Sequence, residues 1–227
     1  MNLIKNTAPG ARPNRQKMPA HELVYQRLRA QILFGEMAPG QAVTIQGLTE
    51  SLNAGMTPVR EAIRRLISDG ALVFQDNRRV SVPALSPEDI EQITFLRKTM
   101  ESELARRAAR RMTPTIVDQL QQLDRAVDQA IASGDVAGYL QRNYDFHALI
   151  NALADAPILT DLVDRLWLRF GPSLRVVCGR WGTSSLPDRH EEALVAMRAR
   201  DGAALARAIH DDISQGIDQI RLSFGAA

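Results

Sequence analysis

Three arginines in the stretch GMTPVREAIRRLISDG, residues 55–70, are spaced so that they could bind phosphate. Arg60, Arg64 and Arg65 lie outside an apolar stripe that recurs at helical spacing. The stripe consists of Val59, Ala62, Ile63, Leu66 and Ile67. Guanidinium groups stay charged and bind phosphate oxygens through paired N–H donors. A charged outer surface is also typical of any solvated helix, so the arginines alone leave both interpretations open.

The elements around the arginines indicate how they would be presented. Thr57 as N-cap, Pro58 at the first helical position and Gly70 as the stop predict a short helix. A preceding short helix over 45–54 is expected to be capped by Thr44. Residues 21–35 predict an earlier amphipathic helix, with an apolar side formed by Leu23, Val24, Leu28, Ile32 and Leu33. Two short helices around a tight turn are typical of a helix-turn-helix.

After Gly70 the apolar period changes from 3.6 to 2. Residues 71–75 and 78–83 alternate around Asp76 and Asn77 and predict a small β-hairpin with Arg78 and Arg79 near its tip. Three helices followed by this hairpin predict a winged helix-turn-helix. Such a scaffold would aim the arginine helix and the basic wing at the phosphates and groove edge of DNA.

The remainder of the chain predicts helices alone. They are expected at 87–111, 114–132, 136–154, 158–179, 187–200 and 203–223. The predicted fold is therefore mainly α: an N-terminal winged helix-turn-helix followed by an all-α bundle of six or seven helices. The predicted domains are a mobile basic tail over 1–18, a DNA-binding domain over 19–84 and a helical domain over 85–227.

Charge and composition agree with two parts of different function. Residues 1–84 hold 11 Lys and Arg against 6 Asp and Glu, whereas the remainder holds 17 against 20. This asymmetry favours a nucleic-acid-binding N-terminal part. No apolar run reaches the roughly 18 residues of a membrane span and no secretory leader is evident, so we expect a cytoplasmic protein without membrane contact. The single cysteine, Cys178, excludes an intramolecular disulfide and is expected to be buried and inert.

The motif TPVREAIRRLISDG with its basic wing, and the connecting turn MAPGQAV, resemble the GntR family of bacterial transcription regulators. The helical part resembles the FadR-type effector-binding domain, named FCD, at LRKTME, NYDFH and RHEEALVAMRARD. The resemblance implies a homodimeric regulator of double-stranded operator DNA, more often a repressor, that responds to a small molecule.

The DNA contacts that this resemblance and the predicted scaffold imply come from two helices and the wing. They are Gln46, Met56, Thr57, Pro58, Arg60, Arg64, Arg65, Arg78 and Arg79. Many relatives carry arginine where this chain has Gln46 and Met56, so the operator sequence cannot be taken from a relative. Gln46 could still recognise adenine through two hydrogen bonds in the major groove.

The resemblance also implies a divalent metal site, because FCD domains commonly hold a metal through an Asp or Asn and three His. His147 and His190 match two of the histidines, and Asn143 lies one helical turn before His147. The third histidine position is Asp212, which the helical periodicity turns inward, whereas His210 falls on the other side. Such a mixed N,O set suits Zn²⁺, Ni²⁺ or Mn²⁺. A polar network without metal is the alternative.

Arg97 is a candidate effector ligand because it borders the predicted bundle core, where a buried arginine needs an anion. Glu101, one turn later, could supply that anion structurally. In the resembling family an arginine at this position meets the carboxylate of the effector, which implies a small organic acid. Tyr144, Trp167 and Arg175 are further candidate lining residues, and packing explains each of them equally well.

Two other functions are compatible with this organisation. A metal-dependent hydrolase would need an activated water and a general base, and neither H-E-x-x-H nor a nucleophile elbow occurs in the chain. We therefore expect no enzyme activity. The other alternative is a DNA-binding protein whose helical bundle serves only for dimerisation.

Overall fold

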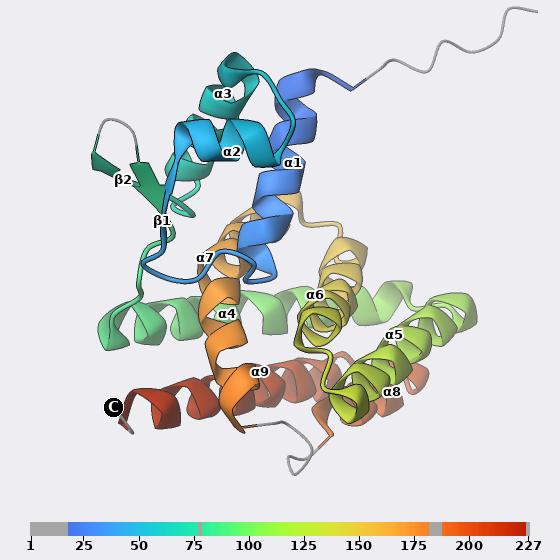
Figure 1. The fold of residues 1–227 in the computed structure, drawn as a ribbon. Coiled ribbons are helices and arrows are strands. Elements are labelled where there is room, and N and C mark those ends of the chain that lie inside the picture. Colours follow the sequence, from blue (N-terminus) through green and yellow to red (C-terminus); the bar gives the residue numbers. More distant parts are fainter. Residues whose placement is uncertain (1–17, 77–78, 182–187, 226–227) are drawn as a thin grey trace, which may run out of the picture.

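The computed structural model describes residues 18–76, 79–181 and 188–225, with the side chains of 176–181 and 219–225 left out. The first part, residues 18–84, forms a small three-helix unit with a sheet, which we call the head (Figure 1). Its elements are α1 (Ala20–Leu33), β1 (Ala42–Thr44), α2 (Ile45–Ser51), α3 (Met56–Ser68), β2 (Val73–Asp76) and β3 (Arg79–Ser81). Residues 1–17 of the predicted tail, Arg78 and the side chain of Cys178 lie outside the described residues.

The arginine helix α3 begins earlier than predicted. Gly55 is its N-cap in extended conformation, so Met56 is the first helical residue and Thr57 is inside the first turn instead of capping it. Pro58 is tolerated there because the first backbone N–H groups of a helix have no intrahelical partner. Gly70 has a φ of +74°, the left-handed conformation that ends the helix as expected.

The wing differs from the expected hairpin by one additional strand. Strands β2 and β3 pair antiparallel around Asp76 as predicted, and β1 pairs antiparallel with the other edge of β3, which gives the order β1-β3-β2. The strand β1 is only three residues long, too short for alternation to reveal it. Thr44, at its end, accepts a hydrogen bond from the backbone N–H of Gly47 and caps α2 as predicted.

The bundle consists of helices, as expected. They are α4 (Pro87–Ala108) with a short 3₁₀ turn η1 (Ala109–Arg111), α5 (Pro114–Ser133), α6 (Val136–Leu153), α7 (Pro157–Trp181), α8 (Arg189–Arg198) and α9 (Gly202–Gly225). Ser86 and Asp89 form the capping box at the start of α4. Helices α4 and α9 lie side by side, and α5 packs against α6 and α8 (Figure 1). None of the helices in the described ranges has the length and apolarity that a membrane crossing requires.

The head rests on the bundle mainly through α1 and α7, which run alongside each other in Figure 1. Val24, Leu28, Ile32 and Leu33 are buried as predicted, but Leu23 is 46% exposed because the buried face of α1 includes Tyr25 instead. Gly171 of α7 allows the close approach, since a Cβ at this position would lie 2.2 Å from the backbone oxygen of Leu33. The end of α1 is thus held directly on the bundle.

Candidate functional site

Two of the three arginines of α3 have exposed guanidinium groups without an ion-pair partner in the described ranges. Arg60 and Arg64 are exposed one turn apart, and neither forms an ion pair with any residue in the described ranges. Arg65, by contrast, lies 2.7 Å from Glu22, and its guanidinium is 3.6 Å from the centre of the Tyr25 ring. The arginines of α3 without an ion-pair partner in the described ranges therefore lie in its second and third turns, while Arg65 ties this helix to α1.

The other predicted DNA contacts lie on the same head. Met56, Thr57 and Gln46 are exposed, and Pro58 is half-buried. The amide of Gln46 donates a hydrogen bond to Glu50 on its own helix, a contact that a base edge could replace. In the wing, Arg79 is exposed and lies 3.2 Å from Asp76.

Inside the bundle, charged and aromatic side chains from all six helices gather in one place. We call this set the buried cluster: Arg97 and Glu101 from α4, Asp124 from α5, His147 from α6, Trp167 from α7, His190 from α8 and Asp212 from α9. Polar groups at this depth require partners, because an unpaired buried charge is costly.

The part of the buried cluster nearest to α4 is an ion pair covered by an indole. Nε of Arg97 lies 2.6 Å from Oε1 of Glu101, and both side chains are at most 3% exposed. Trp167 donates its indole N–H to Oε2 of Glu101 at 3.3 Å, and its ring lies 3.8 Å from the Arg97 guanidinium. Glu101 therefore supplies the anion that the burial of Arg97 requires, which was the structural alternative for this pair.

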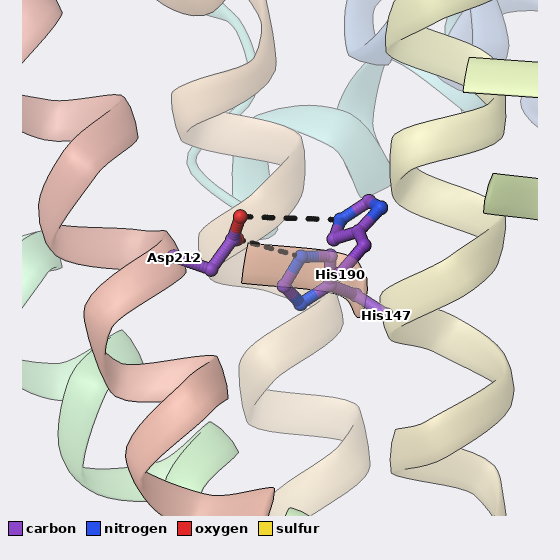
Figure 2. Close-up of side chains that lie close together, drawn as sticks. All are labelled: His147, His190 and Asp212. Atoms are coloured by element: carbon purple, nitrogen blue, oxygen red, sulfur yellow. Dashed lines mark ion pairs between the residues drawn. The ribbon is translucent and has the colours of Figure 1, made fainter. Parts of the chain in front are cut away.

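Two histidines and one aspartate converge at the other side of the buried cluster (Figure 2). Nε2 of His147 lies 3.0 Å from Oδ2 of Asp212, and Nε2 of His190 lies 3.9 Å from Oδ1 of the same carboxylate. One potential ligand atom of each residue falls within 4.8 Å of the others. The predicted orientation is confirmed for Asp212, while His210 lies outside the set beside Asp211.

A second buried carboxylate orients each histidine. Nδ1 of His147 lies 3.2 Å from Glu101, and Nδ1 of His190 lies 3.1 Å from Asp124. Metal-binding histidines typically use their second nitrogen in this way, which fixes the ring and aims the free nitrogen at the metal. Nε2 of His147 is completely buried, and its nearest described partner is the Asp212 carboxylate, with which it forms an ion pair.

Sequence reasoning missed Asp124 and the link between Glu101 and His147. A signal for Asp124 was present, because it interrupts the buried row Val117, Leu120, Val127 of α5 at helical spacing. An acidic side chain in such a row needs a buried partner. The identity of that partner, His190, is 66 residues away and could not be read from the sequence.

The carboxylates of the buried cluster control its protonation. Burial alone would lower the pKa of His147, but Asp212 and Glu101 outweigh burial and raise this pKa to about 9. Burial alone would raise the pKa of Glu101, but Arg97 and His147 outweigh it and lower this pKa to about 2. Arg97 and protonated His147 thus lie beside three carboxylates, those of Glu101, Asp124 and Asp212. A set of carboxylates and imidazoles of this kind can hold a cation.

Asn143 is buried one turn before His147 on α6, and its side chain forms no hydrogen bond with the described part of the chain. Two other predicted site residues lie away from the metal-type set. The Tyr144 hydroxyl points to α1 and α7, where it donates to Asp164. Arg175 packs against Gly35, at the end of α1. Tyr144 and Arg175 therefore contact the region between head and bundle, and their roles as effector ligands stay predictions.

Comparisons with known proteins agree with this arrangement. A family model described as "Bacterial regulatory proteins, gntR family" matches residues 20–82, and the FCD domain model matches residues 92–215. The chain is 28% identical to the HTH-type transcriptional regulator McbR of Escherichia coli K12, across 84% of this chain and 87% of McbR. It is 27% identical to the HTH-type transcriptional repressor RspR of the same strain, across 89% and 91% of the two chains. The solved structure of E. coli McbR/YncC superposes with a TM-score of 0.86 at 26% identity, covering 92% of this chain and all of that one.

Proposed function

Because the chain belongs to the gntR family of bacterial regulatory proteins and carries an FCD domain, we propose that it is a homodimeric repressor controlled by a small carboxylate. The regulator class follows from the family. Control by an effector is supported chiefly by the convergence of His147, His190 and Asp212 in the bundle. The name of the relative RspR describes a repressor, which favours repression over activation.

The residues of the buried cluster fit a divalent cation such as Zn²⁺, Ni²⁺ or Mn²⁺. His147, His190 and Asp212 would hold it, while Asn143 lies near enough in sequence to be a fourth ligand. With His147 neutral, the cation and Arg97 would balance the three carboxylates. A bound cation supplies positive charge and open coordination positions for an acidic ligand. Asp212, at 21% exposure, is the most solvent-accessible of the three proposed ligands.

Arg97 supports the carboxylate assignment. Its Nε is committed to Glu101, but its terminal nitrogens make no hydrogen bond within the described ranges. A guanidinium with free terminal donors binds a carboxylate well, especially inside a protein where water does not compete. We therefore propose that a small organic acid is bound between Arg97 and the metal.

DNA binding would use two heads at once. In a dimer, each α3 would enter the major groove of one half-site of a pseudo-palindrome, with the wing on the adjacent backbone. An effector can change the affinity only if it binds differently to two arrangements of the bundle that place the heads differently. The carboxylate would thus reduce DNA affinity by favouring the arrangement whose heads do not match both half-sites.

Replacing His147 by alanine is expected to abolish metal uptake and effector response while leaving DNA binding intact. Loss of an outer-shell partner already costs about 10–100-fold in metal affinity, and removal of a ligand costs more. Metal content after purification and isothermal titration with Zn²⁺ measure the first effect, and fluorescence anisotropy with duplex DNA measures the second. His210→Ala is the matched control, because His210 is on α9 outside the buried cluster. A responsive His147→Ala protein would exclude the proposed site.

Metal affinity is expected to rise with pH. Because the pKa of His147 is about 9 in the metal-free protein, this ring is protonated at pH 7 and must lose a proton before its Nε2 can bind a cation. The apparent dissociation constant should fall about tenfold per pH unit between pH 7 and pH 9, and change less above pH 9. Titrations in buffers of different ionisation enthalpy would also count the released proton. An affinity independent of pH over this range would contradict the protonation state.

A further inference from the structure

A polar junction joins the head to the bundle a short distance from the buried cluster. Arg29 of α1 lies 2.5 Å from Oδ1 of Asp164 on α7, and it also donates to the hydroxyl of Tyr144 on α6 at 3.3 Å. The Tyr144 hydroxyl donates to the same oxygen of Asp164. We call these three residues the junction. Burial and the Asp164 carboxylate raise the pKa of Tyr144 to about 12, so the hydroxyl keeps its proton near neutral pH.

The junction and the buried cluster share an aromatic wall. The Tyr144 ring packs edge-on against Trp167, with ring centres 5.6 Å apart, and edge-on against Phe34 of the head at 5.9 Å. On its other side Trp167 contacts the His147 ring at 5.2 Å and donates to Glu101. An uninterrupted series of contacts thus leads from the candidate ligand His147 to Arg29 on α1.

Each of two helices contributes one residue to the buried-cluster end of this series and one residue to the junction end. Tyr144 and His147 are three residues apart on α6, and Asp164 and Trp167 are three residues apart on α7. Side chains three apart on a helix are neighbours, so a small rotation of either helix moves both members together. A shift that reorients His147 or Trp167 therefore also displaces an Arg29 partner.

A cavity borders the junction between head and bundle. A polar cavity of about 370 Å³ lies between α1, α3 and α7, beside Arg29 and Asp164. On its far side Asp69, the C-cap of α3, accepts a hydrogen bond from Tyr25 and lies 3.5 Å from Arg165 of α7. Ion pairs around a cavity can exchange partners more easily than a close-packed apolar core can rearrange.

We propose that Tyr144 is the positioning residue that couples the buried cluster to the DNA-binding head, by holding Asp164 and Arg29 in a geometry that depends on Trp167. The proposal rests on the regulatory function proposed above and adds the residues through which regulation passes. A change in the Arg97–Glu101–Trp167 contacts alters the packing of Tyr144, which loosens or tightens the Arg29–Asp164 pair and with it α1. Because α1 packs along α3, the orientation of the recognition helix follows.

Amide hydrogen exchange of the full-length protein tests this coupling without DNA, metal or effector. The exchange rate is measured in peptides covering residues 24–34 of α1, with Glu101→Gln as a perturbation of the buried cluster. We expect Glu101→Gln to accelerate this exchange about fivefold, at the lower end of typical coupling strengths. In a Tyr144→Phe background, which keeps the ring but removes the hydroxyl, the same perturbation should change the rate less than twofold.

Asp155→Asn provides the matched background, because Asp155 is exposed between α6 and α7, outside the junction, and pairs with Arg111 of the bundle. In that background the fivefold effect of Glu101→Gln should persist. Equal effects of Glu101→Gln with and without the Tyr144 hydroxyl, or no effect in either protein, would overturn the coupling.

If the Glu101→Gln protein fails to fold, Trp167→Phe replaces it as the perturbation of the buried cluster, with the same expectations. Loss of metal uptake or of DNA binding, measured separately, would instead refute the proposed function and leave this result standing.

Discussion

Replacing Glu101 by alanine is expected to lower the free energy of unfolding by about 3–5 kcal/mol, the usual cost of removing one partner from a buried ion pair. Glu101 is completely buried and compensates Arg97, His147 and the Trp167 indole at once. His147 can adapt by losing its proton, because its raised pKa depends partly on Glu101. Arg97 has no such route, since a guanidinium stays protonated. Most of the expected loss therefore comes from the guanidinium left without its carboxylate.

Urea unfolding followed by circular dichroism would measure this change, with Glu103→Ala as the matched control. Glu103 is on the same helix two residues later, but its pairs with Arg106 and Arg107 are exposed. Exposed ion pairs contribute at most about 1 kcal/mol, so the control should remain close to the unmodified protein. The double variant Arg97→Met with Glu101→Leu should recover part of the loss, because no unpaired charge remains. Similar losses for Glu101→Ala and Glu103→Ala would contradict the central role of Glu101.

The head could be predicted nearly in full because its signals are local. Capping residues, turn glycines and the change of apolar period are each contained within about ten residues, so α2, α3 and the β2–β3 hairpin follow from the sequence. The prediction was wrong where tertiary contacts decide. Met56 rather than Pro58 is the first residue of α3, β1 forms only because β3 offers an edge, and Tyr25 replaces Leu23 on the buried face of α1.

The buried cluster could be predicted in part. Helical periodicity placed Arg97 and Asp212 on inward faces, and the family resemblance indicated His147 and His190; the structure shows that His147, His190 and Asp212 meet. Helical periodicity predicts which face of its own helix a side chain lies on, but it does not identify the residue that the side chain contacts on another helix. The pairs of His147 with Glu101 and of His190 with Asp124 depend on how six helices pack.

The same limit applies to Tyr144, which sequence reasoning assigned to the effector. In the structure its hydroxyl faces Arg29, 115 positions earlier in the chain. Its ring still borders Trp167, so Tyr144 contacts both the wall of the buried cluster and the head. A residue with two such environments is well placed for regulation. In the coupling proposed above, a ligand bound in the buried cluster would alter the packing of the Tyr144 ring, and the Tyr144 hydroxyl would transmit this change to Arg29 and α1.

Replacing Arg60 by alanine is expected to weaken DNA binding by about 10–100-fold, the range for removal of a base contact worth roughly 1–3 kcal/mol. Arg60 is exposed in the first turns of α3 and forms no ion pair with described residues, so its guanidinium is fully available to the groove. Arg65→Ala should cost less DNA affinity, because Glu22 and Tyr25 already hold Arg65.

The salt dependence of binding would distinguish the roles of these arginines. Anisotropy titrations at several salt concentrations, on duplexes selected from a random library by the unmodified protein, give both the affinity and its slope against salt. If Arg60 binds a phosphate, Arg60→Ala should reduce the slope by about one per head; if it binds a base, the substitution should relax sequence preference and leave the slope nearly unchanged. Arg110→Ala, exposed at η1 of the bundle, removes the same charge far from α3 and should leave affinity within about twofold. Equal affinities for Arg60→Ala and Arg110→Ala would show that α3 does not recognise DNA through this residue.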